Sequence, residues 1–328
     1  MKSLAVIALL LATTPVLAKP ARPGDVGGRR RPPDDQARPH PRPPPPDLDE
    51  ERVPPPPPPP DPVASGPMID QRAELTDGGD PVRLVMTSGG KKPGIKLESK
   101  NGSLELVTAE GVGTMKTAHG TTLIALEVDD AKEPFRIALF DGKKLTKVQR
   151  FARPAKQSNF PFAIAATRTP EGFTVFFQEV ETANPNEAHT FMLAVQKDGT
   201  AGELKEVQIP WALADAIWNG NGYHLALYYT GEMRGARLSM VSTSADGQPQ
   251  GHPDWATQPG AISDLHLVET DGKIRAIYRN VDHMYSTDVT KIGQWGQVTA
   301  KTSDLGALPT TSLIAITAKG QATKVKTK

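Results

Sequence analysis

The sequence repeats itself with a period of about 50 residues over much of its length. Proline recurs at Pro161, Pro210, Pro259 and Pro309, and a short run that includes apolar residues follows each one. A glycine in a turn-forming context follows each proline by 11 to 13 residues, and one further glycine precedes the series; these are Gly120, Gly172, Gly222, Gly272 and Gly320. A chain that repeats one unit of this length buries its apolar faces by stacking copies of that unit.

A second turn follows the first by 22 to 27 residues in several units, at Asp141-Gly142, Asp198-Gly199 and Asp246-Gly247. Asp-Gly pairs between alternating strands are typical of tight hairpins. Two hairpins in about 50 residues predict a four-stranded antiparallel sheet, which is the size of a β-propeller blade. We expect the first hairpin to form the inner pair of strands and the second hairpin the outer pair.

The remaining pattern is also that of an all-β fold, because short apolar and β-branched runs alternate with glycine turns and no helical stripe competes with them. Strands are predicted at residues 82–87, 104–108, 121–128, 173–179, 225–229 and 313–317. Units begin near residues 113, 161, 210, 259 and 309, and the N-terminal piece 82–109 is expected to complete one blade together with the hairpin after Pro309. The prediction is a β-propeller of about five blades over residues 68–328. Six blades, if residues 67–90 form more of a unit, and a β-sandwich are the alternatives.

The first 18 residues have the parts of an export signal: Lys2, an apolar run over residues 4–12, and the small residue Ala18. We expect cleavage before Lys19 and a periplasmic or extracellular protein, with an uncleaved anchor as the alternative. No later run approaches the roughly 20 apolar residues of a membrane-spanning helix, so no membrane span is predicted.

Residues 19–67 hold 19 of the 32 prolines and almost no large apolar side chains. Such a segment cannot build a core, so it is predicted to be disordered, and its proline runs favour a semi-rigid polyproline II conformation. The predicted role is a tether that sets the reach of the domain; the alternative is a ligand for an aromatic-grooved partner.

Composition excludes several classes of protein. The chain has no cysteine, which excludes disulfides, thiol catalysis and thiolate metal sites. Its 38 basic residues nearly balance its 37 acidic residues, so no overall charge points to a nucleic-acid partner.

Residues 216–229, with the sequence AIWNGNGYHLALYY, resemble the blade core of secreted bacterial β-propeller repeat proteins of uncharacterised function. In those proteins a tryptophan, a turn, a glycine and a tyrosine precede an alternating strand. The resemblance implies the fold and implies no activity.

Two acids are candidates for chemistry, although no catalytic residue is assigned. Asp215 and Asp264 each lie five residues after the proline of their unit, in the segment expected to form the innermost strand. Glycoside hydrolases place a pair of carboxylates around their scissile bond, which makes this pair a hypothesis for catalysis. The alternative is that both carboxylates accept hydrogen bonds from neighbouring backbone.

Aromatic residues are the candidates for binding. Trp211, Trp218 and Tyr223 would stack on a carbohydrate if they were exposed, and would fill the space between blades if they were not. The seven histidines show no paired ligand spacing, so neither a metal nor a cofactor is predicted.

These observations favour an exported binding or scaffold module that recognises an envelope protein, a peptide or a polysaccharide through its loops. The alternatives are a carbohydrate-active envelope enzyme and a structural surface component. Nothing in the sequence predicts an oligomeric state.

Overall fold

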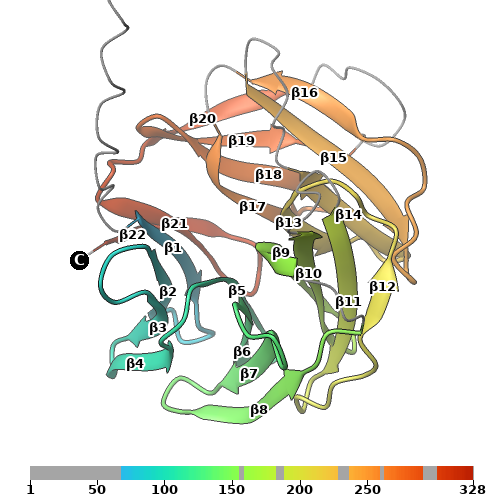
Figure 1. Cartoon of the computed structure of the whole chain (residues 1–328). Coiled ribbons are helices and arrows are strands. Elements are labelled where there is room, and N and C mark those ends of the chain that lie inside the picture. Colours follow the sequence, from blue (N-terminus) through green and yellow to red (C-terminus); the bar gives the residue numbers. More distant parts are fainter. Residues whose placement is uncertain are drawn as a thin grey trace, which may run out of the picture. The chain divides into compact units, whose positions relative to one another are not determined.

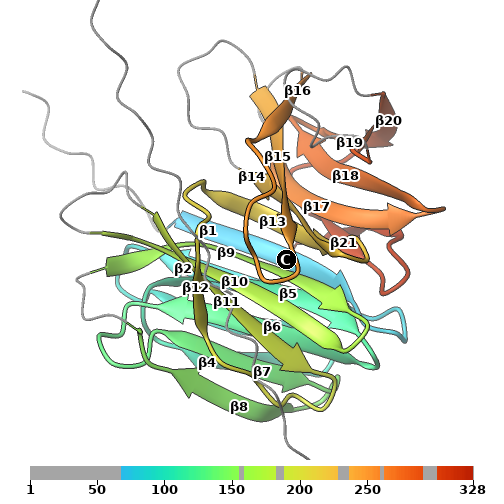
Figure 2. The same ribbon diagram turned by 90° about the vertical axis from the view of Figure 1, so that its right-hand side faces the viewer.

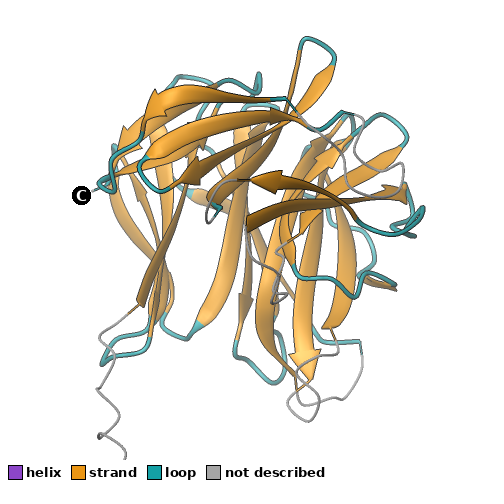
Figure 3. Cartoon of the chain, turned by 90° about the horizontal axis from the view of Figure 1, so that it is seen from above, coloured by secondary structure: helices purple, strands orange, loops and turns teal. Residues whose placement is uncertain are grey.

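The computed structural model describes residues 68–154, 159–181, 188–227, 236–258, 262–290 and 301–327. The predicted signal peptide and proline-rich tether lie outside these residues. All regular elements in the described part are strands (Figure 3), and no helix there is long and apolar enough to cross a membrane.

Five sets of four consecutive strands form antiparallel sheets, which we call blades 1 to 5 (Figure 1). Blade 1 consists of β1 (Met68–Leu75), β2 (Pro81–Ser88), β3 (Gly94–Ser99) and β4 (Gly102–Val107). Blade 2 consists of β5 (Gly111–Ala118), β6 (Thr121–Val128), β7 (Phe135–Phe140) and β8 (Leu145–Phe151). Blade 3 consists of β9 (Asn159–Thr169), β10 (Gly172–Glu181), β11 (Ala188–Gln196) and β12 (Lys205–Val207).

Blade 4 consists of β13 (Leu213–Trp218), β14 (Gly222–Leu227), β15 (Ala236–Ser244) and β16 (Asp254–Gln258). Blade 5 consists of β17 (Ser263–Thr270), β18 (Lys273–Asn280), β19 (His283–Asp288) and β20 (Thr302–Ala307). The chain ends in a hairpin of β21 (Ser312–Ile316) and β22 (Ala322–Lys326). The fold is therefore a five-bladed β-propeller, as predicted, and the first hairpin of each blade is its inner pair of strands.

The two ends of the domain differ from the prediction of one blade shared between the termini. Residues 68–107 form a complete blade by themselves, and β21 adds to the inner edge of that blade by parallel pairing of Ala73 with Ala315 and Glu74 with Ile316. The composite blade was wrong because the polar strand β1 has no apolar alternation by which to recognise it. The parallel contact closes the ring and leaves the inner strand of blade 1 no open edge.

The hydrophobic core is divided into wedges between neighbouring blades. Phe173 and Phe177 of blade 3 pack on Leu123 and Phe135 of blade 2, while Phe176 on the opposite face of β10 packs toward blade 4. Both faces of an inner strand pair are thus buried, which explains why β10 is buried over nine of its ten residues. Figure 2 shows the blades side by side, with the inner strands next to one another.

The repeated glycines have two uses. Gly120, Gly272 and Gly320 have φ values of 78°, 68° and 77°, which favour glycine in their turns. Gly222 was expected to do the same, but in that turn the positive φ belongs to Gly220. A Cβ on Gly222 would lie 2.0 Å from the backbone oxygen of Thr243, so this glycine permits close approach of β15 instead.

Candidate functional site

The inner strands β1, β5, β9, β13, β17 and β21 surround the centre of the ring (Figure 1). Their first residues lie at one end of the ring, which we call the start end. Their last residues and the first hairpin turns lie at the other, which we call the turn end. Each end has a pocket, and a buried polar cluster lies between them.

In this cluster, a side-chain oxygen on one inner strand accepts the backbone N–H of the next inner strand. The four pairs are Glu74 Oε2 with Thr117 N (3.3 Å), Thr167 Oγ1 with Trp218 N (2.9 Å), Asp215 Oδ2 with Leu267 N (2.7 Å) and Asp264 Oδ2 with Ile314 N (2.7 Å). Because parallel inner strands of different blades share few backbone hydrogen bonds, these side chains connect the blades at the centre.

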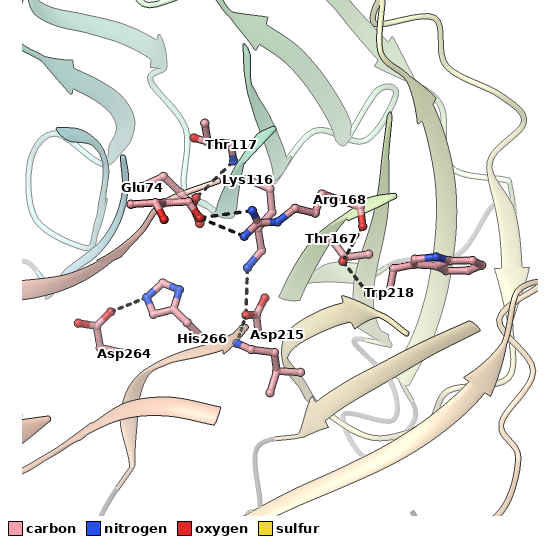
Figure 4. Close-up of polar contacts among 11 residues, drawn as sticks. Glu74, Lys116, Thr117, Thr167, Arg168, Asp215, Trp218, Asp264 and His266 are labelled. Atoms are coloured by element: carbon pink, nitrogen blue, oxygen red, sulfur yellow. Dashed lines mark hydrogen bonds and ion pairs between the residues drawn. The ribbon is translucent and has the colours of Figure 1, made fainter. Parts of the chain in front are cut away.

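Asp215 also forms a buried ion pair that crosses the ring centre. Its Oδ2 lies 3.0 Å from Nζ of Lys116 on β5, and the two side chains are only 1% and 5% exposed (Figure 4). The strand pairing shifts register between Leu213 and Asp215, and such a bulge re-aims the side chain beside it. A carboxylate enclosed in this way holds strands together and is not placed to contact a substrate.

Asp264 has a similar position on the next inner strand. Its φ is 51°, within a register shift of β17, and its Oδ1 lies 3.2 Å from Nε2 of His266 (Figure 4). Both acids singled out from the sequence therefore lie in the buried centre, and the geometry favours the alternative in which they bind backbone.

Glu74 belongs to the same cluster, although its sequence context gave no sign of it. Burial raises the pKa of its carboxyl group, and the nearby charges of Lys116, His266 and Arg168 oppose that rise. Its Oε1 has no hydrogen-bond partner within the described residues. The centre of the ring thus holds one acid that resists ionisation beside another that is ion-paired.

The pocket at the turn end has a volume of about 280 Å³. It is lined by the ends of three inner strands and by the turns beside them: Arg168, Thr169, Pro170, Ile217, Trp218, Glu269, Ala318, Lys319 and Gly320. Glu269 and Lys319 are exposed, and Arg168 and Trp218 are partly buried. An indole, two cations and one acid therefore meet in one open site.

Arg168 separates this pocket from the buried cluster. Its guanidinium donates to the backbone oxygens of Thr317, at 3.3 Å, and Ala318, which connects blade 3 with the C-terminal hairpin. The same charge lies near enough to Glu74 to lower its pKa. Figure 4 shows Arg168 directed toward the ring centre, with Trp218 on the neighbouring strand.

The three aromatic candidates have separate positions. Trp218 lies in the turn-end pocket, and its ring centroid is 5.1 Å from that of Tyr223 in an edge contact. Tyr223 is buried between blades 3 and 4, where its hydroxyl lies 3.0 Å from Oγ1 of Thr174 and burial raises its pKa. It supports Trp218. Trp211 precedes β13 and so lies at the start end, where its backbone oxygen accepts a hydrogen bond from Gln178.

The start end has a pocket of about 310 Å³ that includes the carboxylates of Asp70, Glu110 and Asp129. Nearby on β6, Glu127 is fully buried, and neither of its oxygens has a hydrogen-bond partner among the described residues. Burial and the charge of Glu179 raise the pKa of Glu127 well above its ordinary value. Within the described ranges, no three potential metal ligands are placed to hold an ion.

No protein-family model matches the sequence, and no curated protein matches it. Several solved structures are similar to the chain. An α-L-arabinanase of Penicillium chrysogenum in complex with arabinobiose is 10% identical, with a TM-score of 0.47, over 79% of this chain and 89% of the other. An α-L-arabinofuranosidase of Fusarium graminearum in complex with an iminosugar inhibitor is 9% identical, with a TM-score of 0.47, over 79% and 92%. The six-bladed fucose-binding lectin of Aleuria aurantia is 10% identical, with a TM-score of 0.44, over 79% and 86%.

Proposed function

We propose that the protein is a recognition module that binds a carbohydrate in the turn-end pocket. The observation that supports this function is the presence of Trp218 beside Arg168, Glu269 and Lys319 in one open site of about 280 Å³. An indole offers an apolar face to the C–H groups of a sugar ring. The carboxylate accepts hydrogen bonds from sugar hydroxyls, while the two cations donate them.

The pocket suits a sugar better than a peptide. Peptide-binding sites use a free sheet edge, an apolar groove, a cluster of arginines or a groove lined by several aromatic rings. The turn-end pocket is formed by strand ends and turns, and its lining holds one arginine and one aromatic ring. Polar groups that surround a single ring are instead the arrangement that a polyhydroxylated ligand needs.

The scaffold keeps this site preorganised. Trp218 is held by its edge contact with Tyr223 and by the bond from its backbone to Thr167, and Arg168 is held by the hairpin carbonyls. Side chains that are ordered before binding lose less conformational entropy when the ligand arrives.

Binding without hydrolysis follows from the positions of the acids. Most glycoside hydrolases need two carboxylates that flank the scissile bond. The pocket lining contains one acid, Glu269, whereas Asp215 and Asp264 lie in the buried centre and bind backbone. We therefore propose a binding protein and not a hydrolase.

We also propose that this module is exported, because residues 1–18 have the pattern of a signal peptide. The mass of the mature chain tests the proposal. A chain that begins at Lys19 supports export, and a chain that retains residues 1–18 contradicts cleavage.

Calorimetric titration of the full chain with disaccharides of neutral, N-acetylated and uronic sugars tests the binding function. Trp218→Ala is expected to weaken binding at least about tenfold, because a buried aromatic anchor commonly contributes more than 1.4 kcal/mol. Trp211→Ala is the matched control, since it removes an indole at the other end of β13, and it should leave the affinity unchanged. Equal losses in the two variants, or no binding to any sugar, would contradict the proposal.

A further inference from the structure

A second pocket opens at the turn end, between blades 1 and 2. Its volume is about 260 Å³, and it is lined by four turns and the strand ends that flank them. The polar groups in its lining include Asp77, Asp80, Lys100, Asn101 and Lys143. Its apolar lining includes Pro81 and the buried side chains of Val82 and Phe140.

The groups at this pocket are hydrogen-bonding groups of both kinds. Carboxylates accept, ammonium groups donate, and the amide of Asn101 can do both. Nδ2 of Asn101 donates to the backbone oxygen of Gly142 at 2.6 Å, which fixes the turn of blade 1 against the turn of blade 2. Lys100 is paired with Asp80 at 2.5 Å. The rim is therefore ordered, and its polar character matches that of the first pocket.

The two pockets are neighbours on the same end of the ring. The turn between β5 and β6 contributes Gly120 to the second pocket, and the turn after β9 contributes Thr169 to the first. His119, which precedes Gly120, lies with its Nε2 3.0 Å from the backbone oxygen of Thr169. This single contact forms the ridge between the pockets, and His119 is exposed there.

Size decides how such a pair would be used. Sites that enclose a drug-sized ligand measure roughly 300–1,000 Å³, and each pocket lies just below that range. A chain of small polar units, with one part in each pocket and a link over the ridge, fits two adjoining sites of this size.

We infer that the two pockets are subsites of one track for a polysaccharide, and that the pocket between blades 1 and 2 binds further sugar units of the chain anchored at Trp218. This inference rests on the proposed function. The second pocket exposes no aromatic ring among its described lining residues, so it contributes hydrogen bonds and depends on the anchor. Linked sites of this kind raise affinity with ligand length, because the second contact becomes intramolecular.

The test is a titration of the full chain with a ladder from disaccharide to hexasaccharide, in the sugar series that binds. Affinity should rise with length by about tenfold or more. Lys143→Ala and Asn101→Ala should abolish most of this rise and leave the disaccharide affinity unchanged. Lys144→Ala is the matched control, because Lys144 is an exposed lysine of the same turn that does not line the pocket.

The possible failures are distinguishable. Disaccharide binding that depends on Trp218 but does not increase with length would overturn the track and leave the proposed function intact. A rise with length that survives both pocket variants would also overturn it. If no sugar binds and a peptide does, both proposals are wrong.

Discussion

The turn-end pocket and the buried cluster beneath it are built from similar residue types at very different depths. In the cluster, Asp215 is 1% exposed and its carboxylate binds Lys116 and a backbone N–H. In the pocket, Glu269 is exposed beside Lys319. A buried charge must be paired because its desolvation is costly, whereas an exposed charge remains available to a ligand.

The comparison shows that depth divides structure from recognition in this ring. The acids of the cluster connect one inner strand to the next, so their bonding capacity is used within the fold. Only a few residues separate the two sets along β17, where His266 is buried and Glu269 is exposed. Replacing an acid by its amide at each depth tests this division.

The largest effect is expected for Asp215→Asn. This substitution leaves the ammonium of Lys116 buried without a countercharge, which should lower the free energy of unfolding by about 3–5 kcal/mol. Chemical denaturation of the full chain measures the loss. The double variant Asp215→Asn with Lys116→Met should recover part of it, because the uncompensated charge is removed. A loss below about 0.5 kcal/mol would place the pair outside the stability of the ring.

An effect of opposite sign is expected for Glu74→Gln. Since burial raises the folded-state pKa of Glu74, the folded protein holds this proton more tightly than the unfolded chain. The wild type should therefore be most stable, with respect to this group, below the unfolded pKa of about 4.3, and should lose stability as pH rises through the folded pKa. Glu74→Gln should remove that decline in unfolding experiments between acidic and neutral pH. An unchanged pH dependence would contradict the role of burial.

The smallest effect on stability is expected for Glu269→Gln. The carboxylate is exposed, so the free energy of unfolding should change by less than about 0.5 kcal/mol. Sugar affinity should fall, because the amide is a weaker acceptor for hydroxyl groups than the carboxylate. Thermal unfolding and titration of the same preparation separate the two quantities. A large loss of stability without any change in affinity would reverse the division by depth.

Much of the fold could be predicted from sequence because its signals are local. Pro210 and Pro309 precede inner strands, and Asp141-Gly142 and Asp198-Gly199 form the outer turns with φ values of 91° and 85° at glycine. Blade 1 escaped because its repeat carries neither the proline nor the same turn glycine, and β1 is polar over most of its length.

The site was less predictable, since its contacts join distant parts of the chain. The pattern placed Asp215 on an inner strand, but its partner Lys116 lies 99 residues away and on a different blade. Arg168 contacts carbonyls about 150 residues further along. Trp218 was a candidate from composition, but only the fold separates it from Trp211, because opposite ends of one short strand open on opposite ends of the ring.

Hydrogen exchange of the full chain with and without its bound oligosaccharide tests the central claim most directly, because it shows at which end of the ring the ligand binds. The account predicts slower amide exchange in the turns at residues 169–172, 219–222 and 317–321, with no change at residues 86–90 and 110–112 of the start end. Protection at the start end, with unchanged exchange around Trp218, would contradict it.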